Sequence, residues 1–213
     1  MTSPPSGSPA GPAGSAPLPL PWLASARLPI DGYTQDAPLF RVHASAWPPV
    51  FFGPGPGRPP AFRFDSASGA FGVLYAAPEL EGAFVETLIR RPERLTVDAR
   101  AEIAPRSLAT LRAGRPLRLV RAWGDGLSRL GTTAALSSGP YGASQAWADA
   151  LWEHPDRPDG IAFASRHNNA ELCVALFERE DLGIEVVATR PLLSLAGEVG
   201  ALLDRHGKDL TGL

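Results

Sequence analysis

The chain has 213 residues, of which 44% are hydrophobic and 20% are charged, and its formal net charge is −2. This length suits one domain, or one domain with a tail, and the composition is typical of a soluble globular protein. A net charge so close to zero gives no electrostatic footprint for nucleic acid or for an anionic membrane. We therefore expect no direct nucleic-acid partner and no membrane partner.

Cysteine and histidine usage limits the chemistry further. The single cysteine, Cys173, excludes an internal disulfide, and its apolar surroundings predict a buried structural thiol. The four histidines show no metal-binding spacing, so we expect no metal. No apolar stretch approaches the length of a membrane span, and no charge precedes Arg27 as in a signal peptide. The expected location is the cytoplasm.

The N-terminal segment differs in composition from the rest of the chain. Residues 1–22 contain seven Pro and three Gly, with Ser and Ala between them. Such a segment cannot bury enough apolar surface to offset the entropy lost on ordering. The composition predicts a disordered tail over residues 1–25 and a single folded domain over residues 26–213.

The remaining chain alternates short apolar runs with helical patterns. In chain order the predicted elements are a strand over 38–44, a strand over 72–77, a helix over 78–91, strands over 94–99 and 116–123, a helix over 141–154, strands over 159–165, 171–178 and 184–190, and a helix over 192–207. Proline density makes residues 48–65 a long loop. The mixed order predicts an α+β fold, with a compact mixed sheet flanked by helices.

Two arginines and a tyrosine on these elements are candidates for ligand binding. Arg41 lies in the first predicted strand, and Arg63 stands between two phenylalanines. Each arginine could bind a phosphate. Alternatively, Arg41 lies on an edge strand and pairs with a surface carboxylate, and Arg63 extends its guanidinium into solvent. Tyr75 is either a core tyrosine or an aromatic face for a planar ring.

A glutamate and a serine extend this set. Glu86 lies two residues from Phe84, so about 200° around its helix from the apolar stripe. Glu86 either pairs with Arg90 on an exposed face or lines a cleft with it. Ser165 ends a predicted strand, where it either caps a turn or contacts a ligand beside Arg166. The following residues, 167 and 168, are predicted as turn residues.

Together these residues resemble the RES domain family, named for its Arg, Glu and Ser. The resemblance extends from about Leu39 to Phe177, through the segments LFRVHA, FRFDSASGAFGVLYAAPELEGAFVETL, LGTTAALSSGPYGASQAWADALWE and DGIAFASRHNNAELCVALF. The family pattern implies that Arg41, Glu86 and Ser165 are catalytic. It implies that the substrate is bound by Arg63, Phe64, Tyr75, Gln145, Arg166 and Asn169. The family often has Trp-Asn where this chain has Phe64-Asp65.

The resemblance implies a fold like that of ADP-ribosyltransferases and the role of toxin in a toxin–antitoxin pair. Family members deplete NAD⁺ by cleaving the nicotinamide–ribose bond, so the implied substrate is NAD⁺, without a separate cofactor. The acceptor would be water or inorganic phosphate. The implied partner is an antitoxin with a helix-turn-helix domain.

In this interpretation the two arginines bind the pyrophosphate and Tyr75 stacks on the nicotinamide. Glu86 holds the ribose hydroxyls and offsets the oxocarbenium charge, and Ser165 fixes the nicotinamide side. Three alternatives stay open: ADP-ribosyl transfer to a protein, a non-catalytic nucleotide-binding or interaction module, and surface ion pairs without a site. The oligomeric state is also open, a homodimer included.

Overall fold

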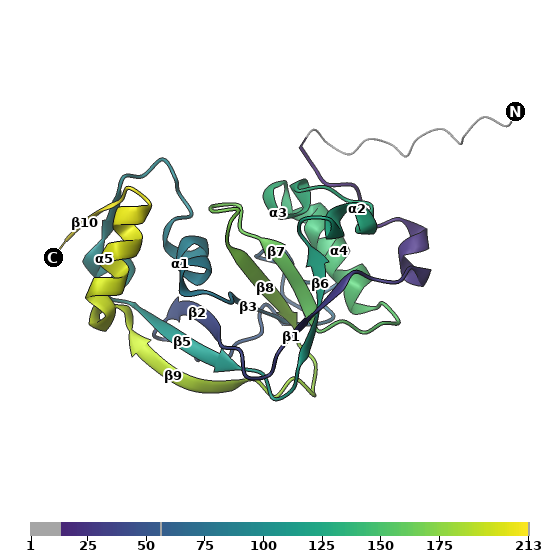
Figure 1. Cartoon of the computed structure of the whole chain (residues 1–213), viewed down its shortest axis with the longest axis horizontal. Coiled ribbons are helices and arrows are strands. Elements are labelled where there is room, and N and C mark those ends of the chain that lie inside the picture. Colours follow the sequence, from purple (N-terminus) through teal and green to yellow (C-terminus); the bar gives the residue numbers. More distant parts are fainter. Residues whose placement is uncertain (1–13, 56, 213) are drawn as a thin grey trace, which may run out of the picture.

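A computed structural model of the chain describes residues 14–55 and 57–212 (Figure 1). The first part of the predicted tail, residues 1–13, lies outside the described residues. Residues 14–25 differ from the prediction, because they pack on the domain: Ala16 and Leu23 are buried, and Pro21–Ser25 forms a 3₁₀-helix. The indole Nε1 of Trp147 donates a hydrogen bond to the Pro17 carbonyl at 2.8 Å. A few apolar side chains are enough to anchor this proline-rich segment.

The larger of the sheets has five strands among the described residues, in the order β1-β6-β7-β8-β3. The strands are β1 (Ile30–Tyr33), β3 (Val73–Ala76), β6 (Leu117–Ala122), β7 (Gly160–Ala164) and β8 (Leu172–Phe177). Strands β6 and β7 are parallel, and the other neighbouring pairs are antiparallel. The sheet is therefore mixed, as the sequence predicts.

A second, antiparallel sheet has the order β2-β5-β9. Its strands are β2 (Leu39–Ala44), β5 (Arg106–Arg112) and β9 (Glu185–Pro191). The two sheets are linked where Phe40 and Ala77 exchange backbone hydrogen bonds of 2.7 and 2.8 Å. A short parallel pair, β4 (Thr96–Asp98) and β10 (Asp209–Thr211), brings the C-terminal segment back to the domain.

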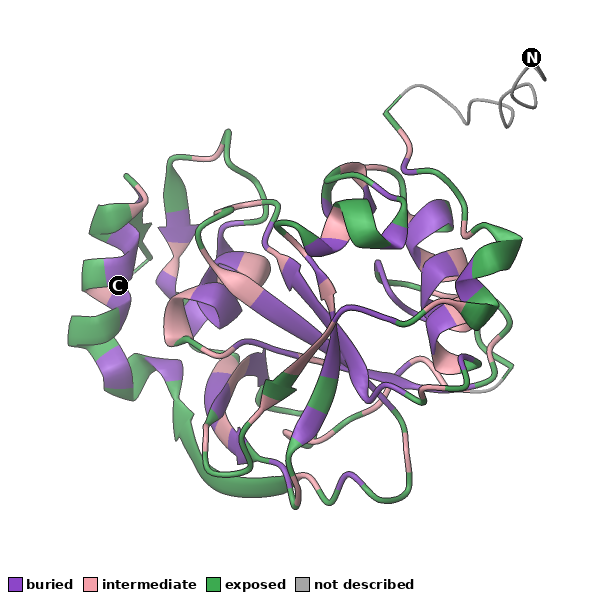
Figure 2. Cartoon of the chain, turned by 45° about the vertical axis from the view of Figure 1, so that its right-hand side comes forward, coloured by how far each residue is buried: buried purple, intermediate pink, exposed green. Residues whose placement is uncertain are grey.

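Strands β3, β7 and β8 of the five-stranded sheet are buried on both faces (Figure 2). In β8, Cys173, Ala175 and Phe177 pack in one apolar cluster, while Val174 and Leu176 pack in another. Neighbouring strand residues point to opposite faces, so the alternation means that each face has its own core. This explains why β7 and β8 read as continuous apolar runs in the sequence.

The helices pack against the strands of both sheets. α1 (Leu80–Leu88) packs against β2 and β8, and α4 (Tyr141–Trp152) packs against β7. Two short helices, α2 (Gly126–Leu130) and α3 (Ala135–Ser138), precede α4 (Figure 1). A π-helix spans Ala99–Ile103, and a 3₁₀-helix, Leu192–Leu195, leads into α5 (Ala196–Arg205).

The α+β class and the mixed sheet flanked by helices are confirmed. Each predicted strand and helix is present, with ends that differ by a few residues. The sequence analysis did not predict β1, β5, β10, α2 or α3. β5 reads RSLATLR, which contains good helix formers, and it becomes a strand because β2 and β9 pair with it on both sides.

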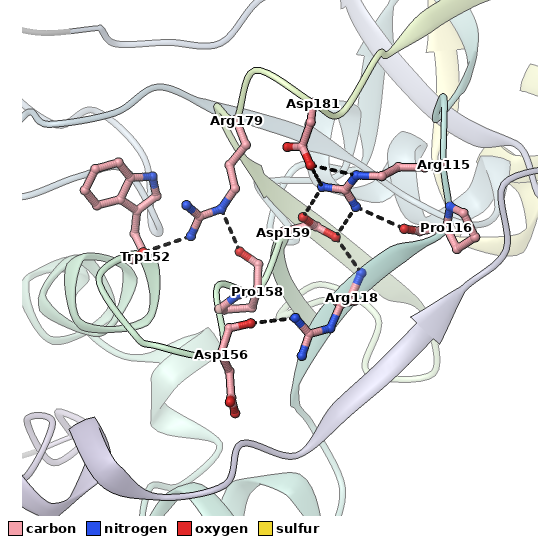
Figure 3. A network of polar contacts seen from close by, with 9 residues as sticks. All are labelled: Arg115, Pro116, Arg118, Trp152, Asp156, Pro158, Asp159, Arg179 and Asp181. Carbon is pink, nitrogen blue, oxygen red and sulfur yellow. Dashed lines mark hydrogen bonds and ion pairs between the residues drawn. The ribbon is translucent and has the colours of Figure 1, made fainter.

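Asp159, which directly precedes β7, is held by a network of polar contacts (Figure 3). Asp159 is buried, and its carboxylate accepts two hydrogen bonds from Arg115, both 2.8 Å, and one from the Arg118 backbone N–H. The Asp159 N–H donates a hydrogen bond to the Arg118 carbonyl of β6, and the Asp159 carbonyl accepts one from the Phe177 N–H of β8. Asp159 therefore joins β6, β7 and β8. Asp181 contacts the same Arg115 from the surface, with 66% of its side chain exposed.

We expect Asp159→Ala to lower the free energy of unfolding by about 2–3 kcal/mol, because it removes a buried carboxylate that accepts three hydrogen bonds. The matched variant Asp181→Ala removes an exposed partner of Arg115 and should cost about 0.5 kcal/mol or less. Urea denaturation of both variants measures the difference. Equal losses would mean that Asp159 does not fix the start of β7.

Candidate active site

A cleft of 340 Å³ lies between α1, the start of β2 and the loop after β7. The side chains that line it include Phe40 and Arg41, Phe62 and Arg63, Tyr75, Glu86 with Thr87 and Arg90, Tyr141, Phe163, Arg166 with His167, and Cys173. The volume is in the range of small-molecule sites. Because Arg41 and Glu86 line one cleft, the alternative of unrelated surface ion pairs is wrong.

Arg41 is held by one nitrogen and leaves another without a partner. Its Nη1 donates a hydrogen bond to the Tyr75 carbonyl at 2.7 Å. Its Nε is buried and has no hydrogen-bond partner within the described residues. Arg41 forms no ion pair with a carboxylate in that part of the chain, although β2 is an edge strand. Burial lowers the pKa of its guanidinium, and Tyr75 opposes this shift.

Arg63 is also held by backbone and has one nitrogen without a partner among the described residues. It is only 6% exposed, so it does not reach for solvent, and its Nη1 donates to the Gly139 carbonyl at 2.8 Å. Its guanidinium lies over the ring of Tyr141, 4.7 Å from the centroid. Its Nη2 is buried and, within residues 14–55 and 57–212, has no hydrogen-bond partner. Burial lowers the pKa of Arg63, and Arg166 lowers it further, while Tyr141 and Glu86 oppose the shift.

The two arginines bring positive charge and unpaired hydrogen-bond donors to the cleft. Leaving a buried donor unpaired costs about 1–3 kcal/mol, more for a charged group. An anionic ligand between Arg41 and Arg63 would fill both free donors with charge-assisted hydrogen bonds.

Glu86 is fixed by Ser165. The Ser165 hydroxyl donates to Glu86 Oε1 at 2.6 Å and accepts hydrogen bonds from the backbone N–H groups of His167 and Asn168, at 3.1 and 3.3 Å. Ser165 is 1% exposed and is not among the residues that line the cleft. It therefore caps its turn and positions Glu86 at the same time. Glu86 forms no ion pair with Arg90 among the described residues, and it lines the cleft with Ala83 of α1 and with Arg90, which follows the helix.

Tyr75 presents its ring to the cleft while its hydroxyl is held elsewhere. The hydroxyl accepts a hydrogen bond from the Phe64 N–H at 2.8 Å and donates to Asp65 Oδ1 at 3.0 Å. Asp65 Oδ2 accepts from the backbone N–H groups of Ala61 and Phe62, at 2.8 and 2.6 Å. Burial raises the pKa of Tyr75 well above its ordinary value, and nearby Asp65 raises it further, so the hydroxyl stays protonated. Asp65 thus holds the loop that carries Arg63.

Tyr75→Phe keeps the ring but leaves the buried Phe64 N–H and Asp65 Oδ1 without their shared partner. We expect a loss of about 1–3 kcal/mol in the free energy of unfolding, measured by urea denaturation. Tyr33→Phe is the control, because the Tyr33 hydroxyl donates to the Pro38 carbonyl at an exposed position. A Tyr75→Phe variant as stable as the Tyr33→Phe variant would contradict a structural role for this hydroxyl.

Three of the residues that the family pattern implied for substrate binding do not line the cleft. Phe64 is fully buried, and its ring packs on Phe163 with centroids 4.9 Å apart, so it belongs to the core. Gln145 uses its Nε2 to donate to the Phe62 carbonyl at 3.0 Å, and so supports the loop from behind. Asn169 is exposed beyond the cleft. Arg166 does line the cleft, as predicted.

Other lining residues were not predicted as part of the site. His167, expected as a turn residue, lines the cleft near Glu86. Burial lowers its pKa most, nearby arginines lower it further, and Glu86 opposes them. Phe62 and Tyr141 supply aromatic surface at the cleft. The arginine-flanking position of Phe62 was the available signal for it; nothing in the local sequence singles out Tyr141.

Other chemistry has little support in the described part of the chain. Within residues 14–55 and 57–212, no group of three or more His, Cys, Asp or Glu side chains is placed to hold a metal ion. Cys173 is buried as predicted, and burial raises the pKa of its thiol. In the same residues, no helix has the length and apolar character needed to cross a membrane.

Comparisons with known proteins agree with this picture. Residues 38–196 match the family described as RES domain. The chain is similar to a protein named "Probable toxin y4kH" from Sinorhizobium fredii (strain NBRC 101917 / NGR234), with 35% identity over 105 residues, which covers 49% of this chain and 82% of that protein.

The fold is similar to a chain in the crystal structure of the M. tuberculosis MbcT–MbcA toxin–antitoxin complex, with a TM-score of 0.54 and 11% identity. The match covers 81% of this chain and 92% of that chain. At this identity the likeness concerns the fold alone.

Proposed function

Because this chain belongs to the RES domain family, we propose that it is the toxin of a toxin–antitoxin pair and that it cleaves the nicotinamide–ribose bond of NAD⁺. The match over residues 38–196 confirms the resemblance found in the sequence from Leu39 to Phe177. The relative named as a probable toxin and the fold shared with a toxin–antitoxin complex support the toxin role. The same two findings support a protein antitoxin as partner.

One observation carries the enzymatic proposal. A carboxylate held by a serine, Glu86 with Ser165, shares a cleft with two arginines whose buried nitrogens lack partners within the described residues. A dinucleotide has a pyrophosphate for the arginines and a ribose next to a cationic leaving group for the carboxylate. Arg41 and Arg63 would bind the pyrophosphate, and the Tyr75 ring would support the planar nicotinamide.

The reaction breaks one carbon–nitrogen bond. The bonding electron pair moves to the ring nitrogen and neutralises the pyridinium, so nicotinamide leaves as a neutral molecule. The ribose C1′ becomes an oxocarbenium centre, and the Glu86 carboxylate stabilises its positive charge. An oxygen nucleophile then bonds to C1′: water gives ADP-ribose and releases a proton, and inorganic phosphate gives the phosphorylated sugar.

Ser165 acts in this proposal through Glu86. A carboxylate oxygen that accepts a short hydrogen bond from a buried hydroxyl keeps one orientation, which leaves its other oxygen for the ribose. Arg166 and His167 follow Ser165 and line the same wall, where they can contact the acceptor. The chain's own groups thus supply binding, orientation and charge.

We expect Glu86→Gln to lower the rate of NAD⁺ loss about 100-fold or more, because the amide cannot offset the developing positive charge. Glu93→Gln, at an exposed position away from the cleft, is the matched control and should keep the wild-type rate. Liquid chromatography of nicotinamide and of the sugar product, with and without phosphate, measures both rates. A fully active Glu86→Gln enzyme would overturn the proposed role of Glu86.

We expect Ser165→Ala to lower kcat about 10- to 100-fold with little change in KM, because Glu86 loses its fixed orientation. Ser194→Ala removes an exposed serine hydroxyl that bonds the Pro191 carbonyl, and should leave both constants unchanged. Steady-state kinetics with NAD⁺ separates the two constants. A raised KM with normal kcat would instead make Ser165 a substrate-binding residue.

A further inference from the structure

A second compartment adjoins the cleft. Its volume is also 340 Å³, and it shares Arg41, Phe62 and Tyr75 with the cleft as common wall. Its other walls include His43, Trp47, Phe51 and Arg58. Most of these residues come from the proline-rich loop predicted over residues 48–65 or stand just before it. We call this space the aromatic compartment.

His43 gives the aromatic compartment a free acceptor. The His43 Nδ1 lies 3.0 Å from the Ala44 carbonyl oxygen. A carbonyl can only accept, so Nδ1 carries the proton and Nε2 presents a lone pair. His43 is only 7% exposed, and its Nε2 has no hydrogen-bond partner in the part of the chain described. A buried acceptor without a donor has lost its hydrogen bond to water, and a ligand N–H or O–H group would replace that bond.

The aromatic compartment also offers flat apolar surface. Trp47 is 58% exposed and Phe51 is 39% exposed, and their ring centroids lie 5.5 Å apart. Exposed aromatic rings beside a buried polar atom are typical of a site for a planar heterocycle. Arg58 and Arg41 make the surroundings positive, which suits a ring attached to a phosphate.

The shared wall connects the two spaces through Arg41. Arg41 lines both spaces, and its buried Nε has no hydrogen-bond partner among the described residues. A dinucleotide consists of two ring-bearing halves joined by a pyrophosphate. Two adjoining compartments with an arginine between them match that layout, and Glu86 identifies the cleft as the reacting half.

We propose that the aromatic compartment binds the adenine ring of NAD⁺, with the ring against Trp47 and its amino group donating to His43 Nε2. The pyrophosphate then lies at Arg41, and the nicotinamide ribose lies beside Glu86. This inference rests on the proposed function for its orientation. Its binding contacts are tested separately, because AMP can occupy the compartment without any reaction.

Isothermal titration calorimetry with AMP tests the stacking contact. We expect Trp47→Ala to weaken AMP binding about tenfold or more, since a base stacked on an aromatic ring contributes that much. Trp22→Ala removes another exposed tryptophan, 44% exposed and outside both spaces, and should leave AMP binding unchanged. Wild-type protein that does not bind millimolar AMP, or equal binding by both variants, would overturn the proposal.

The hydrogen bond to His43 has its own test. Wild-type protein should bind AMP about three- to tenfold more tightly than purine riboside monophosphate, which lacks the amino group. His43→Phe keeps the aromatic volume but removes the acceptor, so the preference should disappear. A preference that survives in His43→Phe, or is absent in the wild type, would show that His43 does not read the amino group.

Kinetics then separates this inference from the proposed function. The ratio of kcat/KM for NAD⁺ to that for nicotinamide mononucleotide, which lacks the adenylate half, should fall about tenfold in Trp47→Ala. An unchanged ratio contradicts adenine binding while leaving NAD⁺ cleavage intact. Tight, Trp47-dependent AMP binding without NAD⁺ cleavage contradicts the proposed function and leaves the nucleotide site in place.

Discussion

The site depends on two guanidinium groups, one half-buried at Arg41 and one buried at Arg63, that have no carboxylate partner among the described residues. Desolvating a charged group is costly unless hydrogen bonds or an opposite charge replace the lost water. Arg41 recovers part of this cost through the Tyr75 carbonyl, and Arg63 through the carbonyls of Leu136 and Gly139 and the Ser144 hydroxyl. Each keeps another nitrogen unpaired among the described residues, which supports the proposal that an anion binds there.

Other side chains at the cleft also use one polar group for a bond within the protein and leave another part for a ligand. The Tyr75 hydroxyl is occupied by Asp65 and the Phe64 N–H, so the ring remains for a ligand. Ser165 is occupied by its own turn and by Glu86, so one carboxylate oxygen is fixed. Buried groups from one element thus orient side chains from another, which holds a site rigid before its ligand arrives. Strands β3, β7 and β8, which are buried on both faces, supply the stable frame.

Sequence patterns predicted the frame better than the walls of the site. Continuous apolar runs identified β7 and β8, and helical spacing placed Glu86 opposite the buried stripe of α1. β5 escaped prediction because its strand state depends on pairing with β2 and β9, which lie far away in the chain.

The sequence also did not predict the direction in which side chains point from loops. Arg63 and Phe64 are neighbours, yet Arg63 lines the cleft and Phe64 enters the core, and no periodic pattern applies outside regular structure. For the same reason His167 was expected only as a turn residue, although it lines the cleft. Ser165 was correctly associated with Glu86, but it stands behind the carboxylate instead of forming an open wall.

The central claim concerns where the anion binds, and a crystal structure of the Glu86→Gln variant with NAD⁺ tests it most directly. We predict pyrophosphate oxygens within hydrogen-bond distance of Arg41 Nε and Arg63 Nη2, with the nicotinamide ribose beside position 86. A dinucleotide bound elsewhere, with both nitrogens still unpaired, would contradict the account.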